Sequence, residues 1–274
     1  MKEKAFLSPG EFVAPVIAWL NANAHGLFKA ISTGVEAVLG LTEAALLAVP
    51  GPILAPAIVL LILWRQGAGM ALLAAGCMAV AGLSGLWLET MQTVALVTIS
   101  VLVAVLIAFP LGVLAAKRPR LEAALRPILD LMQTVPPWVY LIPAVMIFSL
   151  GKVPALLATV IYGVPPMLRL TTLAFKQVPT ELRELGTASG ATGWQTLTRI
   201  EIPSARKTLL LGLNQCILLS LAMVVLAGLV GAGGLGAEVT RGLTRMEMGL
   251  GLRSGLSIVA VAIFMDRLSR RALG

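Results

Sequence analysis

The sequence has little charge and few aromatic side chains. Charged residues make up 12% of the 274 positions and aromatic residues 5%, whereas hydrophobic residues make up 58%. That much apolar material exceeds what a soluble domain of this length buries, so the composition indicates an integral membrane protein. The net charge of +8 is typical of basic cytoplasmic loops in such a protein, and we expect no nucleic-acid partner.

Groups that could ligate a metal are also scarce. The chain has one histidine, His25, and two cysteines, Cys77 and Cys216, both inside apolar segments. Such cysteines usually act as small hydrophobes, and His, Cys, Asp and Glu do not cluster at ligand spacing. We therefore expect no metal site and no redox chemistry. The motif G-x-x-x-x-G-K-[ST] is missing too, so we expect no catalytic residue, no cofactor and no P-loop for ATP in this chain.

Long apolar segments are abundant instead. Seven of them approach the ~20 residues that a helix needs to cross a bilayer: residues 45–64, 68–88, 91–116, 128–150, 153–174, 208–231 and 250–268. The sequence thus predicts an all-α membrane protein with about seven transmembrane helices in residues 45–274. Pro50, Pro52 and Pro56 interrupt the first segment, so we expect its span to begin only near Ile53.

Residues 1–44 differ in character from the rest. Apolar residues recur there at helical spacing, with Lys29 and Glu36 between them, as is typical of an amphipathic helix on the membrane surface or against the bundle. We interpret this segment as extracytoplasmic and too polar to span the bilayer. It lacks the charged, apolar and small-residue order of a cleaved signal, so we expect the chain to insert through its own spans.

The distribution of Lys and Arg predicts the orientation. With the N-terminus outside, 14 of the 21 basic residues fall on the inside, and the other 7 fall outside beside seven acidic residues. Because cytoplasmic loops carry an excess of Lys and Arg, we expect an outside N-terminus and a cytoplasmic C-terminus. Residues 178–207 then lie in the cytoplasm.

The polar stretch 178–207 separates the fifth apolar segment from the sixth. Pro179 suits the first turn of a helix, and Glu181 and Glu184 follow near its positive end, where carboxylates are stabilised. We expect this helix to end at Gly190, because a glycine supplies the left-handed turn that reverses the chain. The two expected helices cover residues 180–189 and 193–200. The pattern predicts a short helix-turn-helix wedge where a soluble partner docks.

The spacing within this loop resembles a known signature. Glu184-Leu185-Gly186, three residues, Gly190, nine residues, Ile200, two residues and Pro203 is similar to the EAA motif of binding-protein-dependent ABC importer permeases, with Leu and Gly replacing the two alanines. In that family the loop is a coupling helix that enters a cleft of the ATPase subunit. The resemblance implies these ATPase-coupling positions: Glu181, Glu184, Gly186, Gly190, Ile200 and Pro203. The alternative is an ordinary cytoplasmic connector with a glycine turn.

Four further segments resemble permease subunits of ProU-type glycine betaine and proline betaine importers: residues 132–143, 163–171, 220–225 and 233–236. The resemblance implies a type I ABC importer transmembrane domain in the bacterial inner membrane. Its implied partners are a second copy of the chain, two ATP-binding subunits that hold ATP and Mg, and a periplasmic or lipid-anchored solute-binding protein. The implied solute is glycine betaine or a related methylated amine, and choline, carnitine and trimethylamine N-oxide remain alternatives.

Aromatic and proline residues suggest where a solute could pass. Prolines in or beside the third to fifth spans indicate kinked helices, which either line a cavity or simply pack. Aromatic faces attract a quaternary ammonium group by about 0.5–2 kcal/mol each, although anchoring at the membrane interface explains Trp and Tyr equally well. The candidate pathway residues are Thr134, Pro136, Trp138, Tyr140, Tyr162 and Met223.

Two other classes of membrane protein are less favoured. A secondary transporter needs ion-coupling groups at mid-membrane, and the predicted spans hold almost no buried charge. We expect Asp130, near the cytoplasmic end of its span, to pair with Arg126 or to snorkel toward the interface rather than to relay protons. A structural membrane protein would not need a docking loop of fixed spacing.

Residues 231–236 fit the pattern G-x-G-x-x-G. A dinucleotide site needs a strand before this motif and a helix after it in a soluble unit, whereas here a membrane span precedes it. We therefore expect no nucleotide there. We interpret the segment as a flexible external turn that acts as a hinge between the last two spans.

Overall fold

The structure is a computed structural model that describes the backbone of residues 9–273 and the side chains of residues 14–271. All regular elements within this range are helical. They are α1 (Pro9–Leu47), α2 (Gly51–Gln66), α3 (Ala68–Leu83), α4 (Trp87–Lys117), α5 (Pro119–Thr134), α6 (Pro137–Phe148), α7 (Lys152–Lys176), α8 (Thr180–Ala188), α9 (Gly193–Thr196), the π-helix η1 (Leu197–Glu201), α10 (Ile202–Ala222), α11 (Val224–Leu229), α12 (Gly234–Thr244) and α13 (Met248–Leu273).

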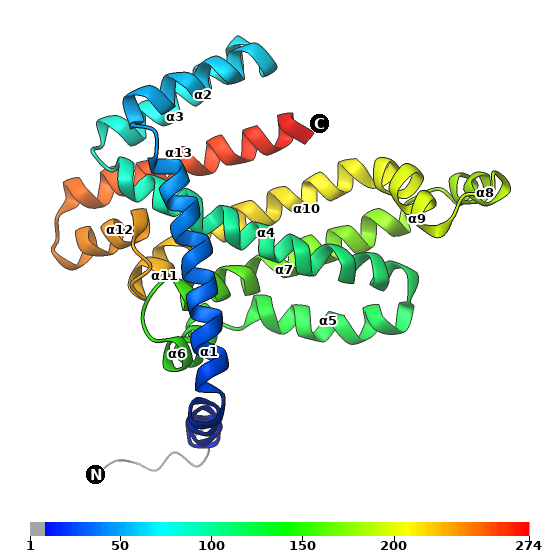
Figure 1. The fold of residues 1–274 in the computed structure, drawn as a ribbon, viewed down its shortest axis with the longest axis horizontal. Coiled ribbons are helices and arrows are strands. Elements are labelled where there is room, and N and C mark those ends of the chain that lie inside the picture. The colour runs from blue at the N-terminus through cyan, green and yellow to red at the C-terminus, as the bar shows by residue number, and fades with distance from the viewer. Residues whose placement is uncertain (1–8, 274) are drawn as a thin grey trace.

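The core lies where α7 packs against α4 and α10 (Figure 1). Glycines allow this close approach. A Cβ atom on Gly112 of α4 would lie 2.6 Å from Thr171 Cβ, and one on Gly163 of α7 would lie 2.9 Å from Cys216 Sγ. Small residues at helix contacts are typical of membrane bundles, where association depends on close van der Waals packing. This packing gives the bundle a rigid centre.

Five helices are long and apolar enough to cross a bilayer: Ala14–Leu47, Trp87–Lys117, Lys152–Lys176, Gly193–Leu229 and Met248–Arg271. A sixth span results if the bent pair α5 and α6 is counted as one. All seven predicted apolar segments are mainly helical, but α2 and α3 have only 16 residues each. At 1.5 Å per residue each is about 24 Å long, shorter than the ~30 Å hydrocarbon core. The count of long spans is therefore below seven.

The segment predicted as a span at residues 128–150 is not one continuous helix, because α5 and α6 meet at 90° and form either a broken span or a re-entrant loop. The backbone is extended at Val135 (ψ 128°) and Pro136 (ψ 138°). A proline disfavours the helical conformation in the residue before it, and Pro136 and Pro137 act in succession. The Tyr140 hydroxyl donates to the carbonyl of Met132 at 3.0 Å and to that of Val135. It thus bridges the bend.

One of the two expectations for Asp130, its pairing with Arg126, is wrong. Asp130 pairs with Arg169 of α7, and Arg126 pairs with Glu122 on its own helix at 3.1 Å. Arg126 is four residues from both carboxylates, so spacing along α5 alone could not choose between them. The packing of α7 beside α5 decides the matter, since Lys176 of α7 also reaches Glu122.

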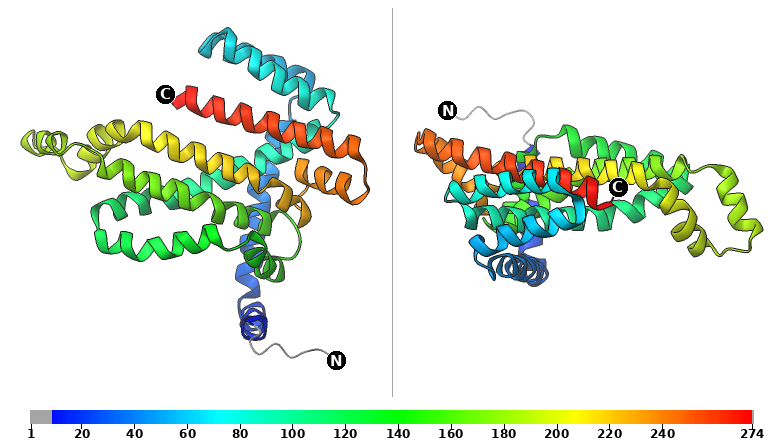
Figure 2. Two further views of the ribbon diagram at one scale, coloured as in Figure 1. Left: turned by 180° about the vertical axis from the view of Figure 1, so that it is seen from behind. Right: turned by 90° about the horizontal axis from the view of Figure 1, so that it is seen from above.

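The expectation that the N-terminal segment is too polar to span is wrong on composition. Ala14–Leu47 has a mean hydropathy of 1.4, and like the other long helices it is long and apolar enough to cross a bilayer. Lys29, Glu36 and Glu43 are seven residues apart and so share one face, and no other Lys, Arg, Asp or Glu occurs in residues 14–47. In space, however, α1 runs crosswise to α4, α7, α10 and α13 (Figures 1 and 2). The side of the membrane nearest to α1 is a matter for the proposal below.

Contacts along α1 fasten it to α6 and the start of α7. They are Asn21 Nδ2 with the Met146 carbonyl at 3.0 Å, the Phe28 ring with the Phe148 ring at 5.5 Å between centroids, and Lys152 Nζ with Glu43 Oε1 at 2.6 Å. Their spread along the helix ties α1 to the bundle at well-separated points.

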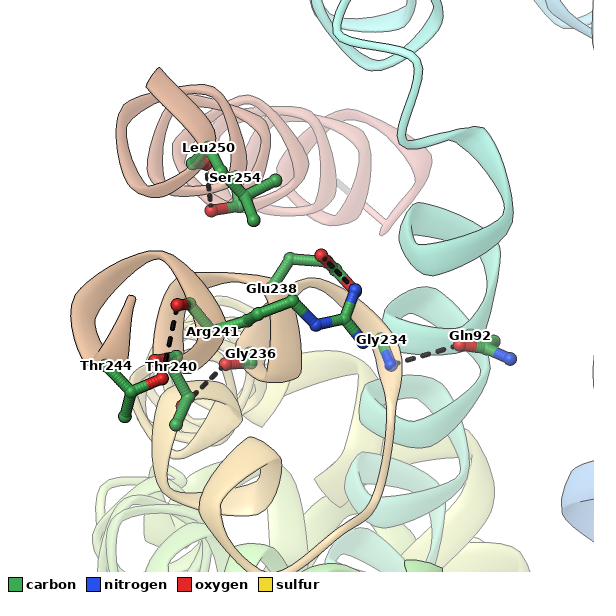
Figure 3. Close-up of polar contacts among 9 residues, drawn as sticks. All are labelled: Gln92, Gly234, Gly236, Glu238, Thr240, Arg241, Thr244, Leu250 and Ser254. Carbon is green, nitrogen blue, oxygen red and sulfur yellow. Dashed lines mark hydrogen bonds and ion pairs between the residues drawn. The ribbon is translucent and has the colours of Figure 1, made fainter. Parts of the chain in front are cut away.

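The glycine-rich segment 231–236 is packed rather than flexible, which corrects the hinge interpretation. A Cβ atom on Gly236 would lie 1.9 Å from the Val224 carbonyl oxygen, so α12 touches α11 backbone to backbone. Figure 3 shows Gln92 of α4 accepting a hydrogen bond from the Gly234 nitrogen at 3.0 Å. The buried Glu238 pairs with Arg241 at 2.7 Å in the same view. Residues 231–236 therefore form a fixed corner.

The connections that we predicted to be cytoplasmic gather at one end of the bundle. The α2–α3 turn, the α4–α5 turn, α8 with α9, and the C-terminus each lie at the right-hand end of their helices in Figure 1. The α3–α4 connection, the start of α7 and α12 lie at the opposite end. The basic residues assigned to one side by the charge count are thus consistent with a shared end.

Candidate functional site

The loop between α7 and α10 projects beyond the bundle as a helix, a turn and a second helix (Figure 1). The expected first helix is confirmed as α8, which begins after Pro179 and ends one residue earlier than predicted. Gly190 follows with φ +73°, the left-handed conformation that glycine adopts without strain. The Ala191 nitrogen donates to the Gly186 carbonyl at 2.9 Å, and the Gly190 nitrogen donates to the Thr187 carbonyl at 3.0 Å. These two bonds form a Schellman turn.

A capping box starts the second helix. The Thr192 nitrogen donates to Gln195 Oε1 at 2.8 Å, and the Gln195 nitrogen donates to Thr192 Oγ1 at 3.3 Å. Each side chain satisfies a backbone donor that the first turn of a helix leaves free. Both ends of the turn are therefore fixed by hydrogen bonds, and α8 and α9 hold one relative orientation.

The second helix is longer than predicted, because α9 continues through the π-helix η1 into α10. Pro203 lies on the first turn of α10 and has no N–H to donate. A proline ring inside a regular α-helix collides with the carbonyl four residues earlier. The wider π-turn just before Pro203 is where the helix accommodates it, and π-turns often occur at functional sites.

Gly186 and Ile200 meet inside the wedge. Gly186 is buried, and a Cβ atom on it would lie 2.7 Å from Ile200 Cδ1. The contact brings α8 directly against η1. Two of the residues singled out in the sequence, fourteen positions apart, thus form the packed centre of the wedge.

Glu201 anchors the wedge to the bundle. It is only 3% exposed, and Arg183 Nε of α8 donates to its Oε1 at 2.9 Å. Lys117 Nζ, at the end of α4, lies 3.3 Å from its Oε2. Arg183 also donates to the Phe175 carbonyl at the end of α7. One buried carboxylate therefore joins α4, α8 and η1.

The outer face of the wedge carries both charge and apolar surface. Glu181 and Glu184 are exposed, Leu185 is 63% exposed, and Trp194 is 72% exposed. Exposed leucine and tryptophan outside the bilayer are typical of a protein–protein contact. A wedge held rigidly on the helices beneath it can bind a partner and transmit its movement.

The comparisons with known proteins identify the family. Residues 108–270, which include the whole wedge, match the family described as binding-protein-dependent transport system inner membrane component. The chain belongs to this family. It is thus a multi-pass membrane permease subunit.

Relatives of known function support the assignment over most of the chain. This permease is 37% identical to the glycine betaine/proline betaine transport system permease protein ProW of Escherichia coli, over 97% of this chain and 75% of that protein. It is 38% identical to the glycine betaine transport system permease protein OpuAB of Bacillus subtilis, over 93% of this chain and 90% of that protein.

A solved structure supports the fold. The permease resembles a chain of the MetNI methionine ABC transporter in an inward-facing conformation, with a TM-score of 0.57 and 22% identity over 66% of this chain and 91% of that one. At that identity the likeness concerns the fold alone. The fold class is the all-α transmembrane domain of a type I ABC importer.

The structure brings together four of the six candidate pathway residues. Thr134, Pro136, Trp138 and Tyr140 surround the α5–α6 bend. The other two are Tyr162, which is half-buried in α7, and Met223, which is buried in the core between α10 and α11. The bend, Tyr162 and Met223 thus lie on different parts of the described fold. Their contact with solute stays a prediction.

Sequence reasoning missed four residues of the coupling site. Glu201 lies next to Ile200 of the matched spacing, and that position was a usable signal. Trp194 and Leu185 were visible as large apolar residues in a polar segment. Arg183 could not have been paired with Glu201, because their contact depends on how α8 folds back.

Proposed function

We propose that this permease carries glycine betaine or a related methylated amine across the bacterial inner membrane, driven by ATP hydrolysis in separate subunits. The observation that carries the proposal is the rigid wedge: Gly190 sets its turn, Gly186 packs on Ile200, and Glu201 fixes it to the spans. A rigid, exposed connection of this kind is what a soluble motor needs to move membrane helices.

The wedge supplies the contact with the ATPase. Glu181 and Glu184 lie on the first two turns of α8, and Leu185 adds an exposed apolar side chain beside them. We infer that these residues, with Gly186, Gly190, Ile200 and Pro203, form the ATPase-coupling unit, within which Gly186 and Ile200 shape the fold. The ATPase subunits, not this chain, hold ATP and Mg.

The assembly contains two copies of this permease, two ATPase subunits and a periplasmic or lipid-anchored solute-binding protein. Two identical ATPases suit a closed two-fold arrangement, with one wedge in each. ATP binding draws the two ATPases together, and the wedges convey that movement through Glu201 to α4, α7 and α10. The pathway between the two copies then shifts from inward-open to outward-open.

The N-terminus lies outside and the C-terminus lies in the cytoplasm in this proposal. The wedge shares its end of the bundle with the α2–α3 turn, the α4–α5 turn and the C-terminus (Figure 1). Those segments hold most of the basic residues, and basic residues favour the cytoplasmic side. α1 then crosses the bundle nearer the external end.

The names of the relatives support the class of solute. Both ProW and OpuAB are named for transport of glycine betaine. A methylated amine carries its own charge, so it needs weak contacts along its path rather than a strong site that slows its release. Exposed aromatic surface at the α5–α6 bend, from Trp138, offers one such contact.

Reconstituted vesicles test the proposal. Permease, the ATPase and the binding protein encoded with it are combined, and uptake of radiolabelled glycine betaine is measured with ATP inside. We expect uptake to depend on ATP. An excess of choline, carnitine or trimethylamine N-oxide should reduce this uptake if that solute shares the path. Uptake of an amino acid, sugar or anion with refusal of every methylated amine would overturn the solute class. Uptake driven by an ion gradient without ATP would overturn the importer class.

A further inference from the structure

An apolar cavity of about 380 Å³ lies between the α2–α3 hairpin, α4 and α13. Its lining includes Ile58 and Ile62 of α2, Met78 of α3, and Val261 and Phe264 of α13. None of the residues placed in the wedge or at the α5–α6 bend takes part. The cavity belongs to a different face of the molecule from the proposed coupling site.

A second cavity, of about 440 Å³, continues the first toward the end of the bundle that carries the wedge. Leu61, Ile62 and Leu268 line both cavities. The second cavity is polar where the first is apolar, because Arg65, Gln66 and Arg271 complete its lining. The two together form one slot, apolar along α2 and α13 and cationic at their ends.

The two arginines have no ion-pair partner among the side chains of residues 14–271, the range for which the structure describes side chains. The Arg65 guanidinium lies 5.6 Å from the centre of the Trp64 ring, and Arg271 Nη1 donates to the Gln66 carbonyl at 2.8 Å. By contrast, the neighbouring Arg270 pairs with Asp266 at 3.0 Å. The cationic end of the slot therefore carries two positive charges whose remaining N–H donors are available to an anion.

We propose that this slot binds an anionic phospholipid, with its phosphate between Arg65 and Arg271 and an acyl chain in the apolar cavity. Guanidinium groups bind phosphate through paired N–H donors, and Arg65 and Arg271 both line the cationic end of the slot. A free phosphate would leave the apolar cavity unused, and an uncharged lipid would leave the arginines unpaired.

The position of the slot in the fold agrees with a lipid ligand. Its apolar part runs along α13, one of the long apolar helices, and its cationic part lies where α2 and α13 end. A phospholipid has the same order of apolar and charged parts across a membrane interface. The buried Gln66 Oε1 accepts no hydrogen bond from the described residues, and a headgroup hydroxyl is a donor of the right kind.

The lipid would hold the α2–α3 hairpin against the bundle. Within the described residues α2 packs chiefly on α3, and α3 packs chiefly on α2 and α13. A chain lying between α2 and α13 fills the gap that this arrangement leaves. The inference does not rest on the importer function, since a lipid can bind whether or not the permease transports a methylated amine.

Native mass spectrometry of the full-length chain in detergent tests the proposal. Phosphatidylglycerol, phosphatidylcholine and glycerol 3-phosphate are added in parallel at equal concentration. We expect a one-to-one adduct with phosphatidylglycerol at about tenfold higher occupancy than with phosphatidylcholine, and no adduct with glycerol 3-phosphate. In the double variant Arg65→Gln/Arg271→Gln the preference should disappear, whereas Arg65→Lys should retain part of it.

Matched variants separate a site from general surface charge. Arg270→Gln removes the same charge one residue away, from an arginine already paired with Asp266, and should bind phosphatidylglycerol like the wild type. Ala260→Phe fills the apolar cavity without touching the arginines, and should lower binding severalfold. Its folding is checked by the melting temperature in lipid-free detergent.

Several outcomes would overturn the proposal. If phosphatidylcholine binds as well as phosphatidylglycerol, the arginines have no role in binding. If Arg270→Gln loses as much phosphatidylglycerol binding as Arg65→Gln/Arg271→Gln, the preference reflects general surface charge. An adduct with glycerol 3-phosphate of equal occupancy would make the slot a phosphate site without an acyl chain. Unchanged lipid binding in a folded Ala260→Phe variant would place the lipid elsewhere.

Discussion

Glu201 Oε1 lies 2.9 Å from Arg183 Nε, and the carboxylate is buried while the arginine is partly exposed. This ion pair joins the π-helix below the wedge to the helix that forms its outer face. Because Lys117 approaches the same carboxylate from α4, removal of Glu201 would leave two cations without their counter-charge. The pair therefore belongs to the structure that couples the wedge to the spans.

Replacing Glu201 should uncouple the wedge. Glu201→Gln keeps the size of the side chain but removes its charge, and we expect a loss of about 2 kcal/mol in folding stability, because breaking a buried pair leaves an uncompensated group. Uptake should fall about tenfold while the ATPase still binds. Uptake in vesicles and the melting temperature of the purified permease measure the two effects.

Asp266→Asn is the matched control, since it breaks an exposed pair with Arg270 that is worth little. It should leave uptake and stability nearly unchanged. A double-mutant cycle between Arg183→Ala and Glu201→Ala then measures the coupling within the pair. A coupling energy near zero would show that the two side chains do not act together.

Gly190 should be replaceable only by residues that accept a positive φ. Its Cβ position has no other atom within 4 Å, so the +73° φ alone restricts it. Gly190→Val should cost about 1–2 kcal/mol and abolish most uptake, because a β-branched residue is strained in this conformation. Gly190→Asn should retain most uptake. Equal activity of both variants at equal protein level would remove the turn from the mechanism.

Gly186 should tolerate replacement by alanine, which adds one carbon atom, but not by valine, which adds three. In Gly186→Ala the only atom that the added Cβ meets more closely than 3.0 Å is Ile200 Cδ1, the end of a flexible side chain that can turn away. Gly186→Val should push α8 from η1 at a cost of about 1–3 kcal/mol and reduce uptake severalfold. Adding Ile200→Ala to the valine variant makes room and should restore part of the uptake. Failure to restore any would place the valine effect elsewhere.

The sequence predicted what depends on local spacing. The signals at Gly190, at Pro179 and in the apolar segments can be interpreted from the residues next to them in the sequence. The structure confirms α8, the left-handed turn and the long helices α4, α7, α10 and α13. The partner of Asp130 and the burial of Glu201 depend on which helices pack side by side. A hydropathy pattern carries no information about that choice.

The sequence could not predict how the chain bends and packs at the ends of the bundle. The extended backbone at Val135 and Pro136 was suggested by consecutive prolines, yet its 90° bend could have been a mild kink. The crosswise direction of α1 has no local signal, because an apolar helix has the same sequence whether it crosses the bundle or runs along it. The packed corner at Gly236 depends on α11 meeting α12.

Labelling tests the orientation of the chain. In a background with Cys77→Ser and Cys216→Ser, we expect Arg245→Cys to react with an impermeant thiol reagent in intact cells and Lys207→Cys to react only after permeabilisation. Both positions are exposed, and they lie at opposite ends of the bundle. The reverse pattern would place the wedge outside the cell and exclude its contact with an ATPase.

Tyr140 should reveal whether its ring or its hydroxyl matters. The hydroxyl bridges the α5–α6 bend through the carbonyls of Met132 and Val135, so Tyr140→Phe keeps the ring and loses only the hydrogen bonding of the hydroxyl, about 1 kcal/mol. Tyr140→Ala also loses the aromatic face. We expect the alanine variant to lower the transport rate of glycine betaine severalfold and the phenylalanine variant to lower it little. Equal losses would assign Tyr140 to the bend rather than to the solute.

The π-helix sets the rotation of the wedge about the axis of α10. Each residue of a regular α-helix turns the chain by about 100°, and η1 widens one turn between residues 197 and 201. Had this stretch been regular, the same residues would place α8 on another side of α10, and Gly186 would not meet Ile200. The direction in which the wedge faces is therefore encoded by an irregularity of one residue in the helix below it.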